Sequence, residues 1–158
     1  ERTALKWMRT HYENAMNISR SEESSSFFYP AMNFIVADLA LHPAGRGRAL
    51  ASKDVFDQAR AGLEKKNEID PDFWSFVGKT ELKLFSAVGQ GTLAREFEGI
   101  LQGFEDLHRR MKGGTEWRSV YDTAEFVLGR YQRAAAPRER AAIDSLLKRL
   151  ADLAGVER

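Results

Sequence analysis

The sequence predicts an all-α protein: a right-handed stack of antiparallel helical hairpins, an α-solenoid, with about seven helices. Apolar residues recur at helical spacing along almost all of the 158 residues, and no stretch shows the sustained alternation typical of strands. Prolines, glycines and capping residues divide the chain into segments of helix length. Two sequence markers also repeat with one common period, which is typical of stacked hairpins.

The expected helices cover residues 3–18, 30–42, 48–66, 71–88, 92–112, 115–134 and 137–154. Pro30 suits the first turn of its helix. Pro43 ends that helix, because the residue before a proline avoids the α region. Asp70 and Pro71 supply a cap and a first turn to the fourth helix.

The clearest apolar stripe lies in the segment 92–112. Thr92 is expected to cap its start, and the pair Gly113-Gly114 is expected to stop it. The side chains of this stripe are expected to pack between hairpins: Leu93, Phe97, Ile100, Leu101, Phe104, Leu107 and Met111. Pro137 suits the first turn of the last helix.

The first repeated marker is an aromatic residue followed three positions later by alanine. It occurs as "YENA" from Tyr12, as "FDQA" from Phe56 and in degenerate form as "FEGI" from Phe97, with spacings of 44 and 41 residues. The second marker is the pair Trp74 and Trp117, which are 43 residues apart. A period of about 40 to 45 residues suits a two-helix unit. We therefore expect Trp74 and Trp117 at equivalent places in successive hairpins.

This period predicts a single helical-repeat domain over residues 1–158. We expect a half repeat followed by three hairpins, over 1–18, 27–66, 71–112 and 115–154. One amphipathic hairpin cannot cover its own apolar side, and stacking buries that side against neighbours. The helix 30–42 is apolar on most sides, so we expect it to pack on both faces. All three tryptophans, Trp7 included, are expected in packed positions. The chain begins without methionine, and we expect it to be a fragment of a longer protein.

Two short motifs resemble those of a known family. The sequence "YPAMN", residues 29–33, resembles the Tyr-Pro-Gly-Ile-Asn motif of divergent tetratricopeptide-like repeats. The segment 72–88 resembles the helix that follows this motif in the family, with matches at Trp74, Thr80, Glu81 and Leu84. Ala31 replaces the usual glycine, and no repeat carries the full ordinary tetratricopeptide pattern.

Such repeats accompany caspase-like (CHAT) protease domains in bacterial proteins, and similar ones form the TRAF-binding regulatory region of apoptosis signal-regulating kinases. The resemblance implies a regulatory scaffold rather than an enzyme. Its partner would be a peptide, a partner domain or an attached effector domain.

The composition argues against nucleic-acid binding, membrane insertion and metal binding. There are 24 basic and 23 acidic side chains, so the net charge of +1 gives no strong field for a phosphate backbone. We therefore expect no nucleic-acid partner. The longest apolar run is far shorter than the ~20 residues that span a bilayer, so no membrane is expected. The chain has no cysteine, and its three histidines lack the spacing of a metal motif. We expect no metal, no cofactor, no catalytic residues and a cytoplasmic location.

The candidate partner-binding groove lies on the first helices of the hairpins, which share the inner side of a superhelical stack. Helical geometry from the two tryptophans turns six residues toward this side: Ser75, Lys79, Lys83, Arg118, Asp122 and Glu125. Their mixed charges suit a transient, salt-sensitive partner. The alternative is a helical-bundle enzyme or small-ligand-binding domain with a pocket near Asn33 and Glu81, because both polar residues lie within apolar helices.

Overall fold

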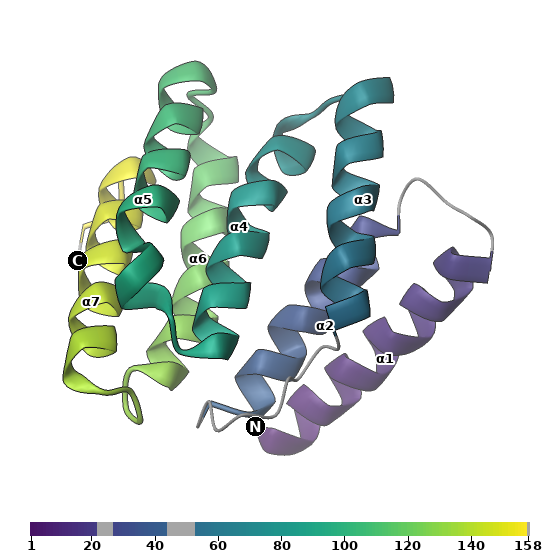
Figure 1. Cartoon of the computed structure of the whole chain (residues 1–158), viewed down its shortest axis with the longest axis horizontal. Coiled ribbons are helices and arrows are strands. Elements are labelled where there is room, and N and C mark those ends of the chain that lie inside the picture. Colours follow the sequence, from purple (N-terminus) through teal and green to yellow (C-terminus); the bar gives the residue numbers. More distant parts are fainter. Residues whose placement is uncertain (22–26, 44–52, 158) are drawn as a thin grey trace.

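The computed structural model describes residues 1–21, 27–43 and 53–157. These residues form seven helices and no strand (Figure 1), so the all-α prediction is confirmed. The helices are α1 (Arg2–Ser21), α2 (Phe28–Leu41), α3 (Lys53–Ile69), α4 (Phe73–Gln90), α5 (Leu93–Arg110), α6 (Gly114–Tyr131) and α7 (Pro137–Leu153). The predicted start of the third helix, residues 48–52, lies outside the described residues.

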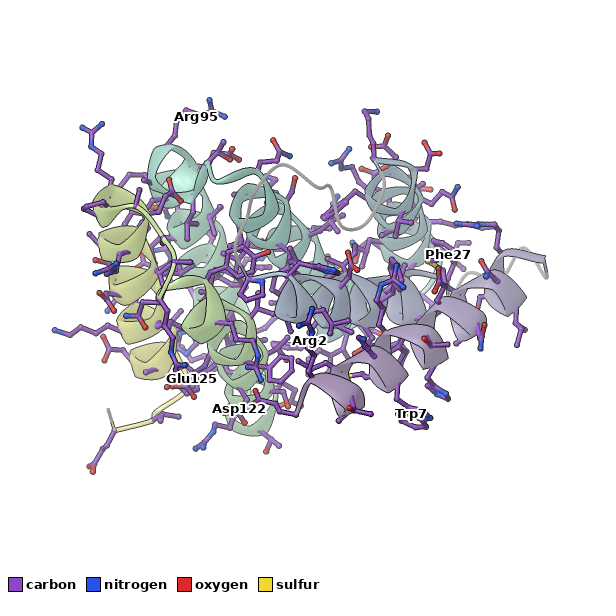
Figure 2. The ribbon with its side chains drawn as sticks, turned by 90° about the horizontal axis from the view of Figure 1, so that it is seen from below. Arg2, Trp7, Phe27, Arg95, Asp122 and Glu125 are labelled. Carbon is purple, nitrogen blue, oxygen red and sulfur yellow. The ribbon has the colours of Figure 1, made fainter. Side chains whose placement is uncertain are left out.

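The helices form two layers that are closed at one end. Figures 1 and 2 show α3, α4 and α5 side by side in one layer and α1, α2 and α6 in the other. The helix α4 contacts α3 and α5 within its layer, and α2 and α6 across the two layers. The last helix, α7, packs on both α5 and α6. The core therefore lies between the two layers.

Most consecutive helices contact each other, including α2 with α3, α3 with α4, α4 with α5 and α6 with α7. One contact goes beyond this scheme, because α2 also packs directly on α6. The hydroxyl of Tyr131, at the end of α6, donates to the carbonyl oxygen of His42 at 3.1 Å. In a linear array each repeat contacts only its neighbours. Here the first and third hairpins meet.

The helix α2 is buried on nearly all sides, as its sequence predicts. It contacts α1, α3, α4 and α6. Every side chain from Phe34 to Ala40 is buried, and that run includes Asp38. A helix with no polar stripe belongs in the interior of a protein.

The caps at two helix starts differ from those predicted. Asp72, rather than Asp70, begins α4: its carboxylate accepts from the backbone N–H of Ser75 at 2.7 Å, and Ser75 Oγ accepts from the Asp72 N–H at 3.0 Å. The side chain of Thr92 makes no capping bond at the start of α5. Instead, Glu139 of α7 reaches across and accepts from the backbone N–H of Ala94 at 3.0 Å.

The three tryptophans occupy different environments, so the prediction that all are packed is wrong for two of them. Trp117 is 1% exposed, and its indole donates to the Met111 carbonyl at 2.7 Å. Trp74 is 43% exposed, because it lies in the first turn of α4 and its neighbour Phe73 takes the place beside Trp117, with ring centroids 5.5 Å apart. Trp7 is 70% exposed.

The stripe of α5 provides a test of the packing. Phe104 is fully buried and its ring meets that of Trp117 edge to face, whereas Phe97 is only partly buried between α5 and α7. Phe104→Ala should lower the free energy of unfolding by ~3–5 kcal/mol. Phe97→Ala should cost less than half as much, because less of its ring leaves a buried environment. Urea denaturation of both variants checks this, and equal losses would contradict the packing described.

Candidate functional site

The outer side of α1 exposes two large apolar side chains, Trp7 and Ile18. The backbone of α1 packs on α2, and Arg20 of α1 also donates from Nε to Gln58 Oε1 of α3 at 2.9 Å. Leu5 and Met16 turn toward α2 and are buried, while Trp7 turns away from it (Figure 2). Successive helical residues are about 100° apart, so Trp7 lies about 200° from both Leu5 and Arg9. This geometry explains why the tryptophan is left uncovered.

Trp7 belongs to a regular row of residues along α1. The residues follow alternating steps of three and four, and we call them the outer face of α1: Ala4, Trp7, His11, Asn14 and Ile18. All five are exposed. The rings of Trp7 and His11 stack with centroids 5.3 Å apart and planes inclined by 13°. Steps of three and four are the spacing of the positions at which two coiled helices meet.

The positions that flank the outer face carry no charge. They are Thr3, Met8, Thr10, Ala15 and Asn17. The charged residues of α1 all lie elsewhere around the helix: Arg2, Lys6, Arg9, Glu13 and Arg20. An uncharged band along an exposed helix is unusual in a chain with 30% charged residues.

An ion pair between the half-buried Arg9 and the buried Asp38 fixes this orientation of α1. Arg9 Nε donates to Asp38 Oδ1 at 2.6 Å, and its guanidinium lies over the Phe34 ring, 5.0 Å from the centroid. Asp38 is 1% exposed, and its Oδ2 has no hydrogen-bond partner among the described residues. Removing one partner of a buried pair is strongly destabilising, since it leaves an uncompensated charge. Arg9 therefore holds α1 with its opposite side outward.

The polar groups around Asp38 link three helices. His42 Nδ1 lies 2.9 Å from the Asp38 carbonyl oxygen and 3.6 Å from Asp38 Oδ1. The His42 carbonyl oxygen accepts in turn from Tyr131 of α6. Burial, together with the nearby charge of Asp38, raises the pKa of Tyr131 above its ordinary value of 10. Tyr131 is therefore a hydrogen-bond donor at neutral pH, and this network joins α1, α2 and α6.

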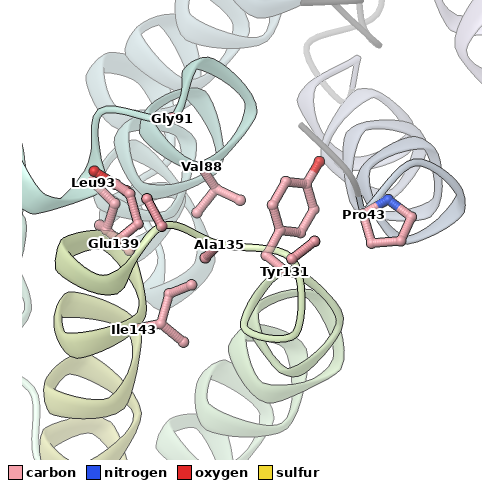
Figure 3. Close-up of a pocket in the computed structure, with 10 residues that line it drawn as sticks. Pro43, Val88, Gly91, Leu93, Tyr131, Ala135, Glu139 and Ile143 are labelled. Atoms are coloured by element: carbon pink, nitrogen blue, oxygen red, sulfur yellow. The ribbon is translucent and has the colours of Figure 1, made fainter. Parts of the chain in front are cut away.

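A small pocket lies where the C-terminal ends of α2, α4 and α6 meet the start of α7 (Figure 3). Its volume is about 210 Å³, and most of its lining is apolar, including Pro43, Val88 and Ile143. The two polar side chains that line it are already used, because Tyr131 donates to His42 and Glu139 accepts from Ala94. Both are committed to holding helices together.

The predicted groove residue Ser75 is not available to a partner. Its side chain is fully buried, and its hydroxyl donates to Asn67 Oδ1 at 2.7 Å while completing the capping box with Asp72. The prediction that it lines a groove is wrong, because the first turn of α4 uses Ser75 to cap itself and to bind α3.

The five other predicted groove residues are exposed on two different helices. Arg118, Asp122 and Glu125 share one side of α6; Arg118 Nε lies 3.0 Å from Asp122 Oδ1, and Glu125 accepts from the Tyr121 hydroxyl at 2.7 Å. Lys79 and Lys83 are exposed on α4, which belongs to the other layer. The three α6 residues therefore lie together, but Lys79 and Lys83 lie apart from them on another helix.

The two residues of the alternative site have separate surroundings. Asn33 Nδ2 donates to the Tyr29 carbonyl oxygen of its own helix at 2.9 Å. Glu81 lies on the inward side of α4, one turn from the fully buried Val77 and Phe85. Burial raises the pKa of Glu81 from 4.5 to about 7, and no hydrogen bond or ion pair from the described residues offsets this effect. Neither Asn33 nor Glu81 lines the pocket of Figure 3.

Metal sites and membrane spans are both missing from the part of the chain that the structure describes. Its residues include no group of three or more histidine, cysteine or acidic side chains placed to hold a metal ion. None of its helices combines the length and the apolar character needed to cross a membrane.

Sequence reasoning missed the outer face of α1 and the ion pair behind it. Two signals for them are present in the sequence. Asp38 is the one charge inside an otherwise apolar helix, so it requires a basic partner from another element. The steps of three and four from Ala4 to Ile18, without charged flanks, can be read directly from the order of the residues.

Replacing Glu81 should change the pH dependence of stability. Burial favours the protonated carboxyl, so the folded chain loses stability as Glu81 ionises between its ordinary value of 4.5 and its folded value of about 7. Glu81→Gln should match the wild type near pH 4.5 and exceed it above pH 7 by up to ~3 kcal/mol, an upper limit because Glu81 keeps some solvent contact. Urea denaturation across this range measures the difference.

The matched control for Glu81 is Glu98→Gln, on the exposed side of α5. This variant should follow the wild type at every pH. A difference between Glu81→Gln and the wild type that stays constant from pH 4.5 to 8 would contradict the burial of an uncompensated carboxyl.

No protein-family model, curated protein or solved structure matches this chain. The candidate site is accordingly defined by the chain's own residues and their contacts.

Proposed function

We propose that this protein is a helical scaffold module that binds other proteins, with the outer face of α1 as its binding surface. The observation that carries the proposal is the exposed stack of Trp7 on His11 within an uncharged band. Tryptophan is enriched among the residues that contribute most to protein interfaces, where it is fully desolvated by the partner. In water, an exposed indole gives no such stabilisation.

The spacing of the outer face indicates the kind of partner. Residues in alternating steps of three and four form a straight stripe along one side of a helix. A second helix laid against this stripe can insert side chains between its members, as in coiled coils and helix-in-groove complexes. The partner that fits is an amphipathic helix with an apolar stripe and few charges beside it.

The rigid attachment of α1 supports this role. A binding surface on a loosely held helix would have to be ordered on binding, at a cost in entropy. The ion pair of Arg9 with the buried Asp38 fixes the rotation of α1 in the free protein, and Arg130 of α6 lies 2.7 Å from the Glu1 carboxylate. The outer face is therefore presented in one orientation.

The pairing of helices into hairpins supports the broader proposal of a tetratricopeptide-like regulatory scaffold. In such a scaffold the seven helices supply a stable support, and the partner contacts one surface of it. The proposed surface replaces the groove first expected on α4 and α6, because the side chains expected there lie in separate layers.

The test is a selection of helical peptides from a displayed library against the immobilised chain. Peptides that bind should lose at least about tenfold in affinity against Trp7→Ser, because the anchor side chain is gone. The matched control is Trp74→Ser, which removes the other exposed tryptophan on a different helix. Binding to this control should be unchanged.

Both variants must retain the fold for the comparison to hold. Trp7 is not part of the hydrophobic core, so Trp7→Ser should leave the circular dichroism spectrum and the melting temperature at their wild-type values. The proposal is wrong if the selected peptides bind Trp7→Ser as tightly as the wild type, or depend instead on Lys79 or Arg118.

A further inference from the structure

We propose that the helix bound by the outer face of α1 is α1 of a second copy, in an antiparallel pair about a two-fold axis. This inference rests on the proposed function and names its partner. A symmetric dimer uses the same patch on both subunits, so that patch must be complementary to itself. Four of the five residues of the outer face, Trp7, His11, Asn14 and Ile18, meet this condition in one antiparallel alignment.

The alignment places the axis between residues 12 and 13, so that residues whose numbers add to 25 face each other. Trp7 then meets Ile18 of the partner subunit, and His11 meets Asn14 of the partner subunit. The first pair joins two exposed apolar side chains, since Trp7 is 70% and Ile18 59% exposed. The second pair joins an imidazole and an amide, which can exchange a hydrogen bond.

The order of these facing residue pairs along the two helices gives the dimer its register. Two apolar pairs, each formed by Trp7 and Ile18, lie on either side of two polar pairs, each formed by His11 and Asn14. A polar residue within an apolar seam fixes register and orientation, because a shifted alignment leaves it without a partner. A parallel alignment would place each residue opposite its own copy, so His11 would meet the partner's His11 and lose the complementary pairing.

The uncharged flanks make a second copy acceptable. In a pair of identical helices, a charged residue beside the contact stripe is present on both helices. Its opposite partner is therefore set by the same sequence and can be a like charge. The five flanking positions of α1 carry none, and its charges lie on the remaining sides. Arg9 follows Trp7 by two residues. It forms ion pairs with Asp38 and with Glu13, the latter at 3.3 Å. The outer face and its five flanking positions therefore set no like charges against each other.

The length of the seam sets the strength of the dimer. Ala4 to Ile18 covers about four turns, roughly 21 Å of helix. An interface of this length lies at the small end of specific interfaces, so we expect a reversible dimer that forms with rising concentration.

Sedimentation velocity of the 158-residue chain over a concentration series up to about 1 mM tests the proposal. The wild type should shift from monomer to dimer. Trp7→Ser should weaken the dimer by at least about tenfold, since its two copies remove both apolar pairs. Trp74→Ser should dimerise as the wild type does. A chain that stays monomeric throughout, or a dimer that is unaffected by Trp7→Ser, overturns the proposal.

A charge pair then tests the orientation. In the double variant His11→Glu with Asn14→Lys, the antiparallel alignment sets each new acid against a new base of the partner subunit. This variant should dimerise at least as well as the wild type, whereas Asn14→Lys alone should weaken the dimer. A parallel alignment would oppose like charges and abolish dimerisation of the double variant, which would overturn the antiparallel arrangement.

The failure of this inference can be told apart from the failure of the proposed function. If the chain is monomeric but selected helical peptides require Trp7, the outer face binds helices other than its own copy. If the chain is monomeric and no peptide depends on Trp7, both proposals fail together.

Discussion

The burial of α2 is the constraint on which the rest of this structure depends. Its apolar side chains surround the helix, so no single neighbour can cover them, and α1, α3, α4 and α6 all contact it. A linear stack covers a helix mainly through its own hairpin and the next. Covering α2 from the far side brings the third hairpin back onto the first, and the hydrogen bond from Tyr131 to the His42 carbonyl joins them. Closure of the bundle thus follows from the sequence of one helix.

A second consequence of this burial is the placement of α1. Because Asp38 lies within the buried run from Phe34 to Ala40, its carboxylate requires a cation from a neighbouring helix. Arg9 supplies it, and its guanidinium also covers Phe34. The angular position of Arg9 on α1 then determines which side of α1 turns outward. The exposure of Trp7 and His11 is therefore linked to a charge that is buried in the neighbouring helix.

The sequence predicted the all-α class and the seven helices, because both depend on local periodicity and on prolines and glycines. It failed where a distant element intervenes. Thr92 looks like a cap, but Glu139 arrives from α7 and binds the start of α5. Trp74 and Trp117 share a sequence period, yet Phe73 occupies the space beside Trp117. The candidate groove failed for a related reason, since helical geometry gives the direction of a side chain but not the layer to which its helix belongs.

The two ends of the bundle differ in chemistry, and the difference supports a module that binds at one end. The exposed side of α7 carries charged residues, among them Lys148 and Asp152. Such a surface is well hydrated, as at the terminal repeats of helical arrays. The outer face of α1 lacks charge and exposes an indole. The charged surface is stable in contact with water, whereas removing the exposed indole of Trp7 from water would be favourable, which is consistent with the proposed binding surface.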